Sequence, residues 1–318
     1  MVTFVHGPVR VSVPATSANL GPGFDALGLA LSLRDELVGE VVSSGLSVST
    51  EGEGASTVPA DESHLVVRAM RAAFDAMGCT PPGLSLSCVN AVPHSRGLGS
   101  SSAAIVGGIW LARALVAGGR LLMDDDACFQ LATALEGHPD NVAAAVYGGF
   151  VISGASGPSG PSGELAESGS DGSRFFAVPS GVDPRVSTVV FVPPAGVPTT
   201  LARKLLPETV PHDDAAANSG RAALLVAALG AHPEHLLLAT QDLLHQDYRT
   251  QAMPESLRLM HRLRADGIAA VVSGAGPTVL AFSAGHRGAA CQTELRARCP
   301  DGWTALHLTV ERDGVLVR

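Results

Sequence analysis

The chain has 318 residues, of which 46% are hydrophobic and 16% charged, and Lys+Arg 21 against Asp+Glu 30 gives a net charge of −9. This composition is typical of a globular protein with a large apolar core in one or two domains. The acidic balance argues against a broad surface for a nucleic-acid backbone. An anionic ligand would therefore need local devices, such as helix N-termini, backbone amides, a few arginines or a metal ion.

The cysteines and the apolar runs exclude further classes. The chain has 5 cysteines and no C-x-x-C pair, which favours free thiols in a reducing compartment over disulfides or structural zinc. Residues 1–13 lack the basic and apolar segments of a secretory signal. Uncharged apolar runs such as 103–112 and 222–231 are about 10 residues long, too short to cross a bilayer. We expect a cytoplasmic protein without a membrane or nucleic-acid partner.

The first part of the chain alternates predicted strands and helices. Residues 9–13 alternate as a half-buried strand and run into a loop rich in Gly and Pro. Helical spacing is predicted over 63–77, opened by Ser63 or Asp61 and closed by Gly78. The elements predicted next are a strand at 84–88, a helix over 101–117, a helix from 124–126 to 137 and a short helix over 139–146.

The second part is α+β in character. It follows a Gly/Ser/Pro-rich segment at 153–173, which predicts a flexible loop. Strand patterns lie at 186–192, 269–273, 278–282, 304–310 and 314–317. Helical patterns lie at 199–206, 214–229, 233–248, 255–266 and 286–298. We therefore divide the chain into an N-terminal domain at 1–152, the loop at 153–173 and a C-terminal domain at 174–318.

The segment PHSRGLGSSSAA at 93–104 lies between a predicted strand and a predicted helix. Gly97 and Gly99 let the backbone approach a ligand closely, and the helix N-terminus offers unpaired N–H groups to an anion. No lysine follows, as a Walker A loop requires, and Ser102 stands where a Rossmann fingerprint needs glycine. By its pattern alone the segment could also be an ordinary helix cap.

Four motifs in order give the chain a resemblance to the GHMP small-molecule kinases. The segment above resembles their phosphate loop, P-x-x-x-G-L-G-S-S-x-A, and is accompanied by PATSANLGPGFDALG at 14–28, EGHPDN at 136–141 and VVSGAGPTVLAF at 271–282. SANLGPGFD together with HPDNVA resembles the homoserine kinases within that superfamily. The resemblance implies an α+β GHMP-kinase architecture, with a ribosomal-protein-S5-like N-terminal half, a ferredoxin-like C-terminal half and an active site between them.

The resemblance also implies an activity, the transfer of phosphate from ATP to L-homoserine in threonine biosynthesis, with Mg²⁺ required. It implies that the nucleotide is bound by Pro93, His94, Ser95, Arg96, Gly97, Leu98, Gly99, Ser100, Ser101, Ser102 and Ala103. Glu136 and Ser101 would bind the metal, as a carboxylate and a hydroxyl, with waters completing the shell. EGHPDN is a short version of this motif, since many relatives have six more residues between the glutamate and the asparagine.

The resemblance to these kinases also implies which side chains bind the substrate. Asp25 would bind its ammonium group, Arg249 its carboxylate and Arg203 chiefly the transferring phosphoryl group. The full substrate set implied is Asn19, Asp25, His138, Asn141, Thr199, Arg203 and Arg249. Read without the resemblance, Asn19 and Asp25 could form an Asx turn and a helix cap, and isolated arginines are usually solvated.

Asn141 and Arg203 are the catalytic residues that the resemblance implies. Asn141 stands where several GHMP relatives have a catalytic aspartate, and an amide cannot act as a general base at neutral pH. We therefore expect Asn141 to orient the hydroxyl and Arg203 to stabilise developing charge. The alternative is that His138, which titrates near neutrality, serves as the base.

Two rival functions remain open on the sequence. One is another GHMP kinase with a mevalonate-type or sugar substrate, against which Asn141 argues. The other is a non-catalytic GHMP-fold binding protein, against which the retained phosphate loop and Glu136 argue. His64 departs from the Asn-Leu-Val that relatives often have before the first long helix, so the adenine pocket is expected to differ. A homodimer is compatible with the resemblance, although the sequence does not fix the oligomeric state.

Overall fold

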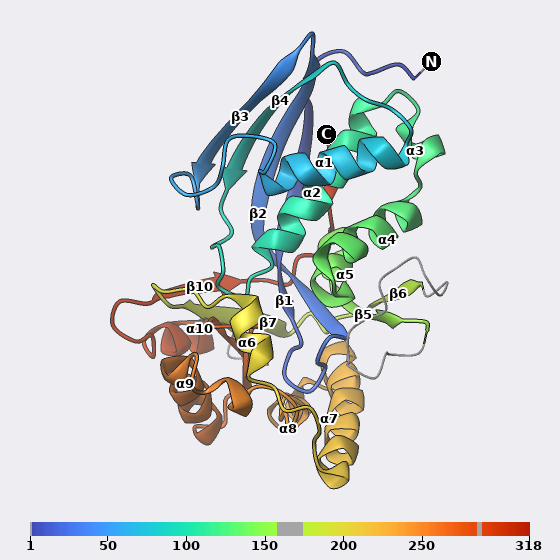
Figure 1. Cartoon of the computed structure of the whole chain (residues 1–318). Coiled ribbons are helices and arrows are strands. Elements are labelled where there is room, and N and C mark those ends of the chain that lie inside the picture. The colour runs from blue at the N-terminus through green and yellow to red at the C-terminus, as the bar shows by residue number, and fades with distance from the viewer. Residues whose placement is uncertain (1, 158–173, 285–287) are drawn as a thin grey trace.

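Two β-sheets organise the chain, which a computed structural model describes over residues 2–157, 174–284 and 288–318 (Figure 1). The strands of the first sheet are β1 Val9–Ala18, β2 Leu27–Val42, β3 Gly45–Gly52, β4 Gly83–Asn90, β5 Phe150–Ala155, β6 Phe175–Ser180 and β11 Leu316–Val317. They follow the order β11-β1-β2-β4-β3, with β5 on β2 and β6 on β5. The second sheet has the order β10-β7-β9-β8, from strands β7 Val186–Val192, β8 Ala270–Val272, β9 Val279–Ala284 and β10 Thr304–Leu308.

Helices cover one face of the first sheet. They are α1 Leu65–Ala76, α2 Ser100–Leu115, α3 Gly119–Leu122, α4 Asp125–Glu136 and α5 Pro139–Tyr147. The central one, α2, is buried on nearly all sides because its residues are small or apolar. A Cβ on Gly108 would lie 2.6 Å from the carbonyl oxygen of Val66 in α1, so glycine permits the close packing of these two helices. This packing holds α2 in place between α1 and the first sheet.

Both faces of the second sheet are buried, because successive side chains point to opposite faces and both sets are apolar. Val189 and Phe191 of β7 face one apolar core with α6 Thr199–Lys204, α9 Pro254–Ala265 and α10 Gly288–Arg296. Val190 and Val192 face another core with α7 His212–Gly230 and α8 Leu236–Ala239. Within the described residues, none of the helices combines the length and apolar character needed to span a bilayer.

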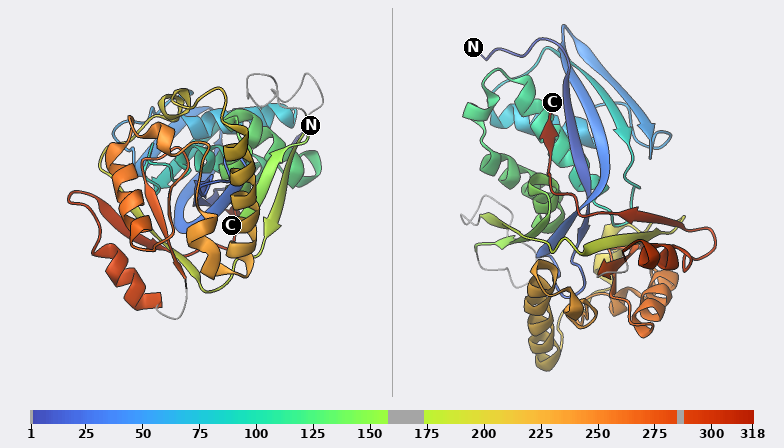
Figure 2. Two further views of the ribbon diagram at one scale, coloured as in Figure 1. Left: turned by 90° about the horizontal axis from the view of Figure 1, so that it is seen from below. Right: turned by 180° about the vertical axis from the view of Figure 1, so that it is seen from behind.

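The β1–β2 ribbon connects the two cores. The pairing register shifts between Pro14 and Ala15, where proline cannot donate a ladder hydrogen bond. Val13 lies in the core of the first sheet, whereas Ala15 and Leu20 lie in the core that β7 also faces. Figure 2 shows this long ribbon from behind, running from one sheet to the other. The turn between β1 and β2 therefore lies where the two sheets meet.

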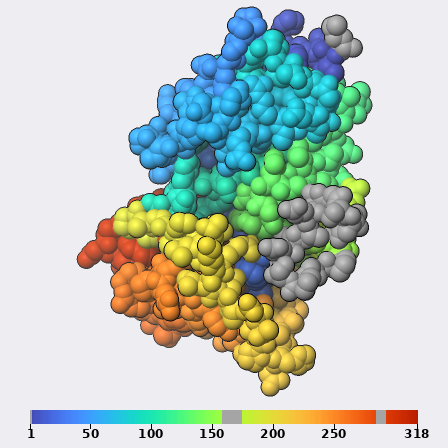
Figure 3. Space-filling view, viewed as in Figure 1, coloured from blue at the N-terminus to red at the C-terminus, as the bar shows by residue number. Residues whose placement is uncertain are grey.

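The second half of the chain contributes strands to both sheets. β6 and β11 come from 174–318, yet they pair with β5 and β1 of the first sheet. Residues 153–155 of the expected loop belong to β5, and 158–173 lie outside the described residues. Figure 3 shows the segment around α6, in yellow, at the front where the blue-to-green and yellow-to-red parts meet.

Two expectations about helices are wrong. The segment 233–248 is broken into the 3₁₀ turn η1 Pro233–His235, α8 and a loop that ends in η2 Asp247–Arg249. The Asp242 carboxylate breaks it, because it accepts the N–H groups of residues 244–246 that a continuous helix would use internally.

The second wrong expectation concerns the N-terminal cap of α1, which was predicted to be Ser63 or Asp61. His64 caps this helix, since its Nδ1 accepts the Val66 N–H at 3.2 Å. Asp61 instead accepts the N–H and the hydroxyl of Ser63 in the preceding turn. A histidine at this place thus performs the capping that asparagine commonly performs.

Candidate active site

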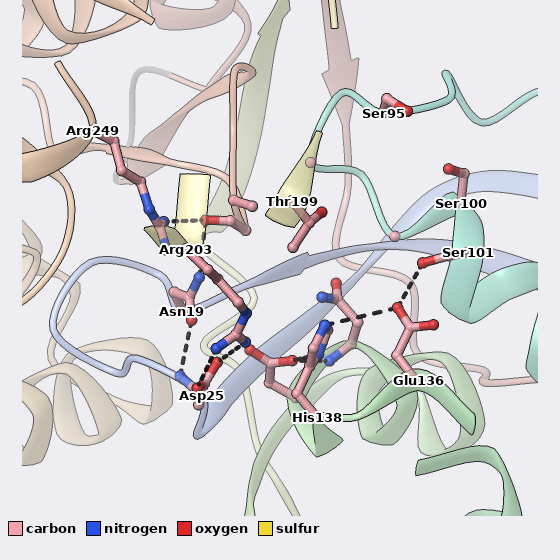
Figure 4. A pocket seen from close by; sticks show the side chains of 16 residues that line it. Asn19, Asp25, Ser95, Ser100, Ser101, Glu136, His138, Thr199, Arg203 and Arg249 are labelled. Atoms are coloured by element: carbon pink, nitrogen blue, oxygen red, sulfur yellow. Dashed lines mark hydrogen bonds and ion pairs between the residues drawn. The ribbon is translucent and has the colours of Figure 1, made fainter. Parts of the chain in front are cut away.

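A cavity of about 180 Å³ opens where the two sheets meet (Figure 4). The β1–β2 turn, the loop before α2, the α4–α5 junction and α6 all contribute to its wall. It brings together every residue predicted to bind substrate or metal: Asn19, Asp25, Ser101, Glu136, His138, Asn141, Thr199, Arg203 and Arg249. Ser95, Gly97, Gly99, Ser100, Asp140, Gly274 and Ala275 complete the lining.

A second cavity of about 260 Å³ adjoins the first along Ser95, Ser100 and Ser101. Its lining is more apolar and includes Leu65 and Val66 at the start of α1. The polar groups at its wall are Asp35, Ser63, His64, Asn90 and His94. The two cavities therefore have the loop before α2 as a common wall.

The glycines of the loop before α2 hold it in a left-handed conformation. Gly97 has φ +75° and Gly99 has φ +73°, which favour glycine. A Cβ on Gly97 would lie 2.1 Å from the Ser273 carbonyl oxygen, and one on Gly99 would lie 1.9 Å from Thr16 Oγ1. No acidic residue occupies the first turn of α2. The unpaired N–H groups there can therefore receive an anion.

The motif at 271–282 supports this loop through two hydrogen bonds. The Ser273 hydroxyl donates to the Gly97 carbonyl at 2.6 Å, and the Thr278 N–H donates to the Arg96 carbonyl at 3.2 Å. The predicted loop residues divide by position. His94 and Ala103 line the second cavity, whereas Pro93, Arg96, Leu98 and Ser102 line neither cavity. The Arg96 guanidinium donates to backbone carbonyls of His94, Pro193 and Pro194, and Leu98 lies in a core.

Glu136 faces the start of α2. Its Oε1 accepts the hydroxyls of Ser101 at 2.6 Å and Ser102 at 2.8 Å, and its side chain is 8% exposed. The nearest positive group is His138, whose Nε2 lies 3.9 Å from Oε1. This hard oxygen pair fits Mg²⁺. Across the described part of the chain, no group of three or more His, Cys, Asp or Glu could hold a metal. A cation would thus need further oxygens from a ligand and water.

His138 is paired with a buried carboxylate that the sequence analysis did not single out. Asp140 is 1% exposed, and its Oδ1 lies 2.8 Å from His138 Nδ1 and accepts the Asn141 N–H at 2.7 Å. Burial disfavours the charged imidazole, but the carboxylates of Asp140 and Glu136 outweigh it and raise the pKa of His138 to about 9. His138 is therefore an imidazolium at neutral pH. Only its place inside HPDN could have drawn attention to Asp140.

Asn141 is oriented by a contact across the site. The Thr16 hydroxyl donates to Asn141 Oδ1 at 2.8 Å. The amide nitrogen then faces the cavity without a protein partner among the described residues. It can donate a hydrogen bond to a ligand oxygen. Thr16 is a second residue that sequence reasoning missed, because only the folded β1 strand brings it to α5.

Asp25 and Arg203 form a two-point ion pair across the mouth of the cavity. Arg203 Nη2 lies 2.6 Å from Asp25 Oδ1, and Nη1 lies 3.0 Å from Oδ2. Asn19 supports this turn, since its Oδ1 accepts the Asp25 N–H and its amide donates to the Gly274 carbonyl, both at 2.9 Å. Asn19 and Asp25 are themselves left-handed, with φ +67° and +53°. The contact joins residues six apart, wider than an Asx turn, and Asp25 precedes strand β2 rather than a helix, so the interpretation as an Asx turn and a helix cap is wrong.

Arg249 is a buried cation at the back of the cavity. It is 1% exposed, and its Nη1 contacts the Gly274 carbonyl at 3.1 Å and the imidazole of His245 at 3.0 Å. Burial and the nearby charge of Arg203 lower the pKa of Arg249 to about 10, so it stays charged at neutral pH. The Phe24 ring lies under both guanidinium groups, 5.5 Å from that of Arg203 and 5.7 Å from that of Arg249.

Comparison with known proteins gives consistent matches. The family model for the GHMP kinases N-terminal domain matches residues 64–149, and that for the GHMP kinases C-terminal domain matches 222–301. Homoserine kinase of Streptomyces avermitilis is 52% identical over 314 residues, which cover 99% of this chain and 97% of that protein.

Solved structures share the fold. One from Listeria monocytogenes, a candidate homoserine kinase, has a TM-score of 0.73 and 31% identity and covers 98% of this chain and 99% of that one. Homoserine kinase from Cytophaga hutchinsonii has a TM-score of 0.79 and 23% identity, and the match covers 99% of each chain.

Proposed function

The chain belongs to the homoserine kinase family of the GHMP kinases, and we propose that it transfers the γ-phosphoryl group of ATP to the side-chain hydroxyl of L-homoserine. The products are ADP and O-phospho-L-homoserine, for threonine biosynthesis in the cytoplasm. The observation that carries this proposal is a phosphate-type loop, Asp25 and two arginines around one cavity. These groups match a polyphosphate and an amino-acid zwitterion.

The nucleotide spans the two adjoining cavities in this proposal. Its phosphates lie on the loop of Gly97 and Gly99, where the N-terminus of α2 presents N–H groups. Its base lies in the more apolar second cavity, beside Val66 and His64. Because His64 already accepts the Val66 N–H through Nδ1, its Nε2–H is the edge that remains for a ligand.

Glu136 and Ser101 would hold Mg²⁺, which would neutralise phosphate charge when bound. Their present contact, an O–O distance of 2.6 Å, places a carboxylate and a hydroxyl at the start of α2. Ser102 keeps Glu136 in place from the buried side, since its hydroxyl donates to the same oxygen. Binding of a cation would therefore replace the Ser101 hydrogen bond while the Ser102 hydrogen bond anchors the carboxylate.

The Asp25–Arg203 pair is the proposed place of the substrate's charged end. The ammonium group of homoserine pairs with Asp25, and its carboxylate pairs with Arg249, whose guanidinium has no carboxylate partner among the described residues. Thr199 lies four residues before Arg203 on α6 and lines the same wall. When Asp25 engages the ammonium group, Arg203 is released in part toward the transferring phosphoryl group. Substrate charge thus substitutes for an internal ion pair.

Phosphoryl transfer needs no general base in this arrangement. The Asn141 amide donates to the homoserine hydroxyl oxygen and orients it toward the γ-phosphorus. The new O–P bond forms as the bond to ADP breaks, and the hydroxyl proton passes to a phosphoryl oxygen. His138, as an imidazolium paired with Asp140, has no lone pair to accept that proton. Arg203 and the cation site stabilise the charge on the transferring group.

A substrate panel with coupled detection of ADP tests the proposal. We expect homoserine to be turned over fastest, because only an amino acid offers both an ammonium group for Asp25 and a carboxylate for Arg249. Mevalonate has the carboxylate alone, and sugars have neither. Faster turnover of mevalonate or a sugar would replace homoserine as the substrate. Failure of ATP to bind in the presence of Mg²⁺ would favour a non-catalytic binding protein.

A further inference from the structure

His245 lies behind the substrate wall and makes two directed contacts. It is 1% exposed, its Nε2 lies 2.7 Å from the Gly21 carbonyl oxygen, and its Nδ1 lies 3.0 Å from Arg249 Nη1. A carbonyl can only accept and a guanidinium can only donate. The tautomer is therefore fixed, with the proton on Nε2 and the lone pair of Nδ1 directed at Arg249.

The surroundings keep this imidazole neutral. Burial disfavours its charged form, and the guanidinium of Arg249 adds to that effect, so that the pKa of His245 falls to about 4 although Asp242 opposes the shift. The Asp242 carboxylate accepts the backbone N–H of His245 and lies 3.7 Å from its ring Nε2. The ring packs on Phe24, with centroids 5.1 Å apart. The acceptor for Arg249 thus persists throughout the physiological pH range.

Arg249 has few other restraints. Its Nη1 also donates to the Gly274 carbonyl, and its buried Nε has no hydrogen-bond partner within the described residues. The plane of a guanidinium determines where all of its donors point. The contact with His245, together with those with the Gly274 carbonyl and the Phe24 ring, therefore sets which donors of Arg249 face the cavity.

We propose that His245 is a positioning residue for homoserine recognition, which orients the guanidinium of Arg249 toward the substrate carboxylate and links it to the turn that carries Asp25. This inference rests on the proposed function. A competing interpretation is that His245 only anchors the turn through Gly21. The two interpretations depend on different nitrogens of the ring, so variants can separate them.

Asparagine and glutamine each retain one of the two contacts. In His245→Asn the amide lies near the place of Nδ1, so its oxygen can accept from Arg249 while the contact with Gly21 is lost. In His245→Gln the amide lies near the place of Nε2, so its nitrogen can donate to Gly21 while the acceptor for Arg249 is lost. His245→Phe loses both and keeps the ring contact with Phe24.

The measurement is the KM for homoserine and for ATP, with Mg²⁺·ATP binding as the control for folding. We expect His245→Gln and His245→Phe to raise the homoserine KM by at least about tenfold, as for a lost hydrogen bond to a charged group. We expect His245→Asn to remain within about threefold of the wild type and all ATP KM values to change little. The reverse order of Asn and Gln, or equal effects on both substrates, would overturn the assignment.

Imidazole ¹⁵N resonances of the wild-type protein provide a test that needs no variant. We expect homoserine to shift the Nδ1 resonance of His245, because the carboxylate draws the Arg249 donors, and nucleotide alone to leave it in place. No shift at saturating homoserine would overturn the proposal even if the variants fail to fold. Wild-type turnover of homoserine is measured first, since its absence refutes the proposed function, whereas normal turnover with the wrong variant order refutes the role of His245 alone.

Discussion

At the scale of single residues, the charges of the cavity are arranged in two groups. Glu136 and the His138–Asp140 pair lie near the start of α2, Asp25 and the two arginines form the other group, and Arg203 links the two because its charge also acts on Asp140 and Glu136. Between them, Asn141 contributes an uncharged amide. A substrate can contact both groups if its hydroxyl reaches Asn141 while its ammonium and carboxylate groups remain beside Asp25 and the arginines. These contacts lead to the following predictions for individual side chains.

Asp25 should govern the affinity for homoserine and leave that for ATP unchanged. Loss of a charged hydrogen bond is worth about 1.5–3 kcal/mol, so Asp25→Ala should raise the homoserine KM roughly tenfold or more. Alanine is also strained at the φ of +53° found here, whereas asparagine tolerates it. Asp25→Asn is therefore the control, and steady-state kinetics should show the same rise. If only the alanine variant is impaired, or if both KM values rise together, Asp25 merely organises the turn.

Arg203 should contribute chiefly to the rate of the chemical step. Its guanidinium contacts Asp25 in this structure and becomes available to the phosphoryl group when homoserine takes that carboxylate. We expect Arg203→Ala to lower kcat by on the order of 10²–10³, as for removal of a preorganised charge-stabilising donor. ATP affinity should change less. Rapid-quench measurement of the chemical step tests this, and an effect confined to KM would assign Arg203 to binding.

His138 should titrate far above an ordinary histidine. Burial opposes its charge, but Asp140 and Glu136 raise its pKa to about 9. Because the folded-state pKa exceeds the unfolded value of 6.5, this contribution to stability is complete below about pH 6.5 and is lost as pH rises through 9. NMR titration should place the midpoint near 9, and His138→Asn should retain turnover. Abolished turnover together with loss of an acidic limb in the kcat–pH profile would make His138 the base.

At the scale of elements, local signals predicted more than long-range ones. The loop at 93–104 and its helix α2 follow from neighbouring glycines and small residues, and both are present. The 233–248 helix failed because the Asp242 side chain takes backbone N–H groups, which periodicity does not register. β2, β3, β5 and β6 were not predicted, although β2 is 16 residues long, because their pairing partners are brought together only by folding. The Thr16–Asn141 contact was missed for the same reason, since it joins residues 125 positions apart that only folding brings together.

The phosphate loop yields an element-scale prediction. Gly97→Ala combines left-handed strain with a Cβ placed 2.1 Å from the Ser273 carbonyl oxygen, which belongs to the backbone and cannot move freely. We expect the ATP KM to rise by at least about tenfold as the loop shifts. The matched control is Gly78→Ala, where φ is +65° and no atom in the described ranges lies within 4 Å of the added Cβ.

The control variant separates strain from collision. Gly78→Ala should lose about 1–2 kcal/mol of unfolding free energy from the left-handed backbone alone and keep the wild-type ATP KM. Urea unfolding and steady-state kinetics on both variants make the comparison. An unchanged ATP KM in Gly97→Ala would show that the loop adapts to a side chain, and would remove the argument for its close packing on Ser273.

At the scale of the whole molecule, the two sheets are mechanically joined. The β1–β2 ribbon supplies residues to two cores, and the C-terminal residue Arg318 exchanges backbone hydrogen bonds with Arg10 at 2.8 and 3.1 Å. The site also depends on both parts, since Asp25 comes from the ribbon and Arg203 from α6. Neither part therefore holds the complete site alone. We expect the described fold to unfold as one cooperative unit.

The two tryptophans are probes of that cooperativity. Trp110 is buried in α2 in the core of the first sheet, and Trp303 packs on the core under the second sheet. In Trp303→Phe the fluorescence reports on the first core alone, and in Trp110→Phe on the second. Because each substitution can change stability, the fluorescence transition of each variant is compared with its own far-UV circular dichroism in urea. We expect the two transitions to coincide in both variants, since a joined structure has no stable half. A fluorescence midpoint that separates from the circular-dichroism midpoint in either variant would show that the two sheets unfold independently, and the ribbon would then be a tether between two folding units.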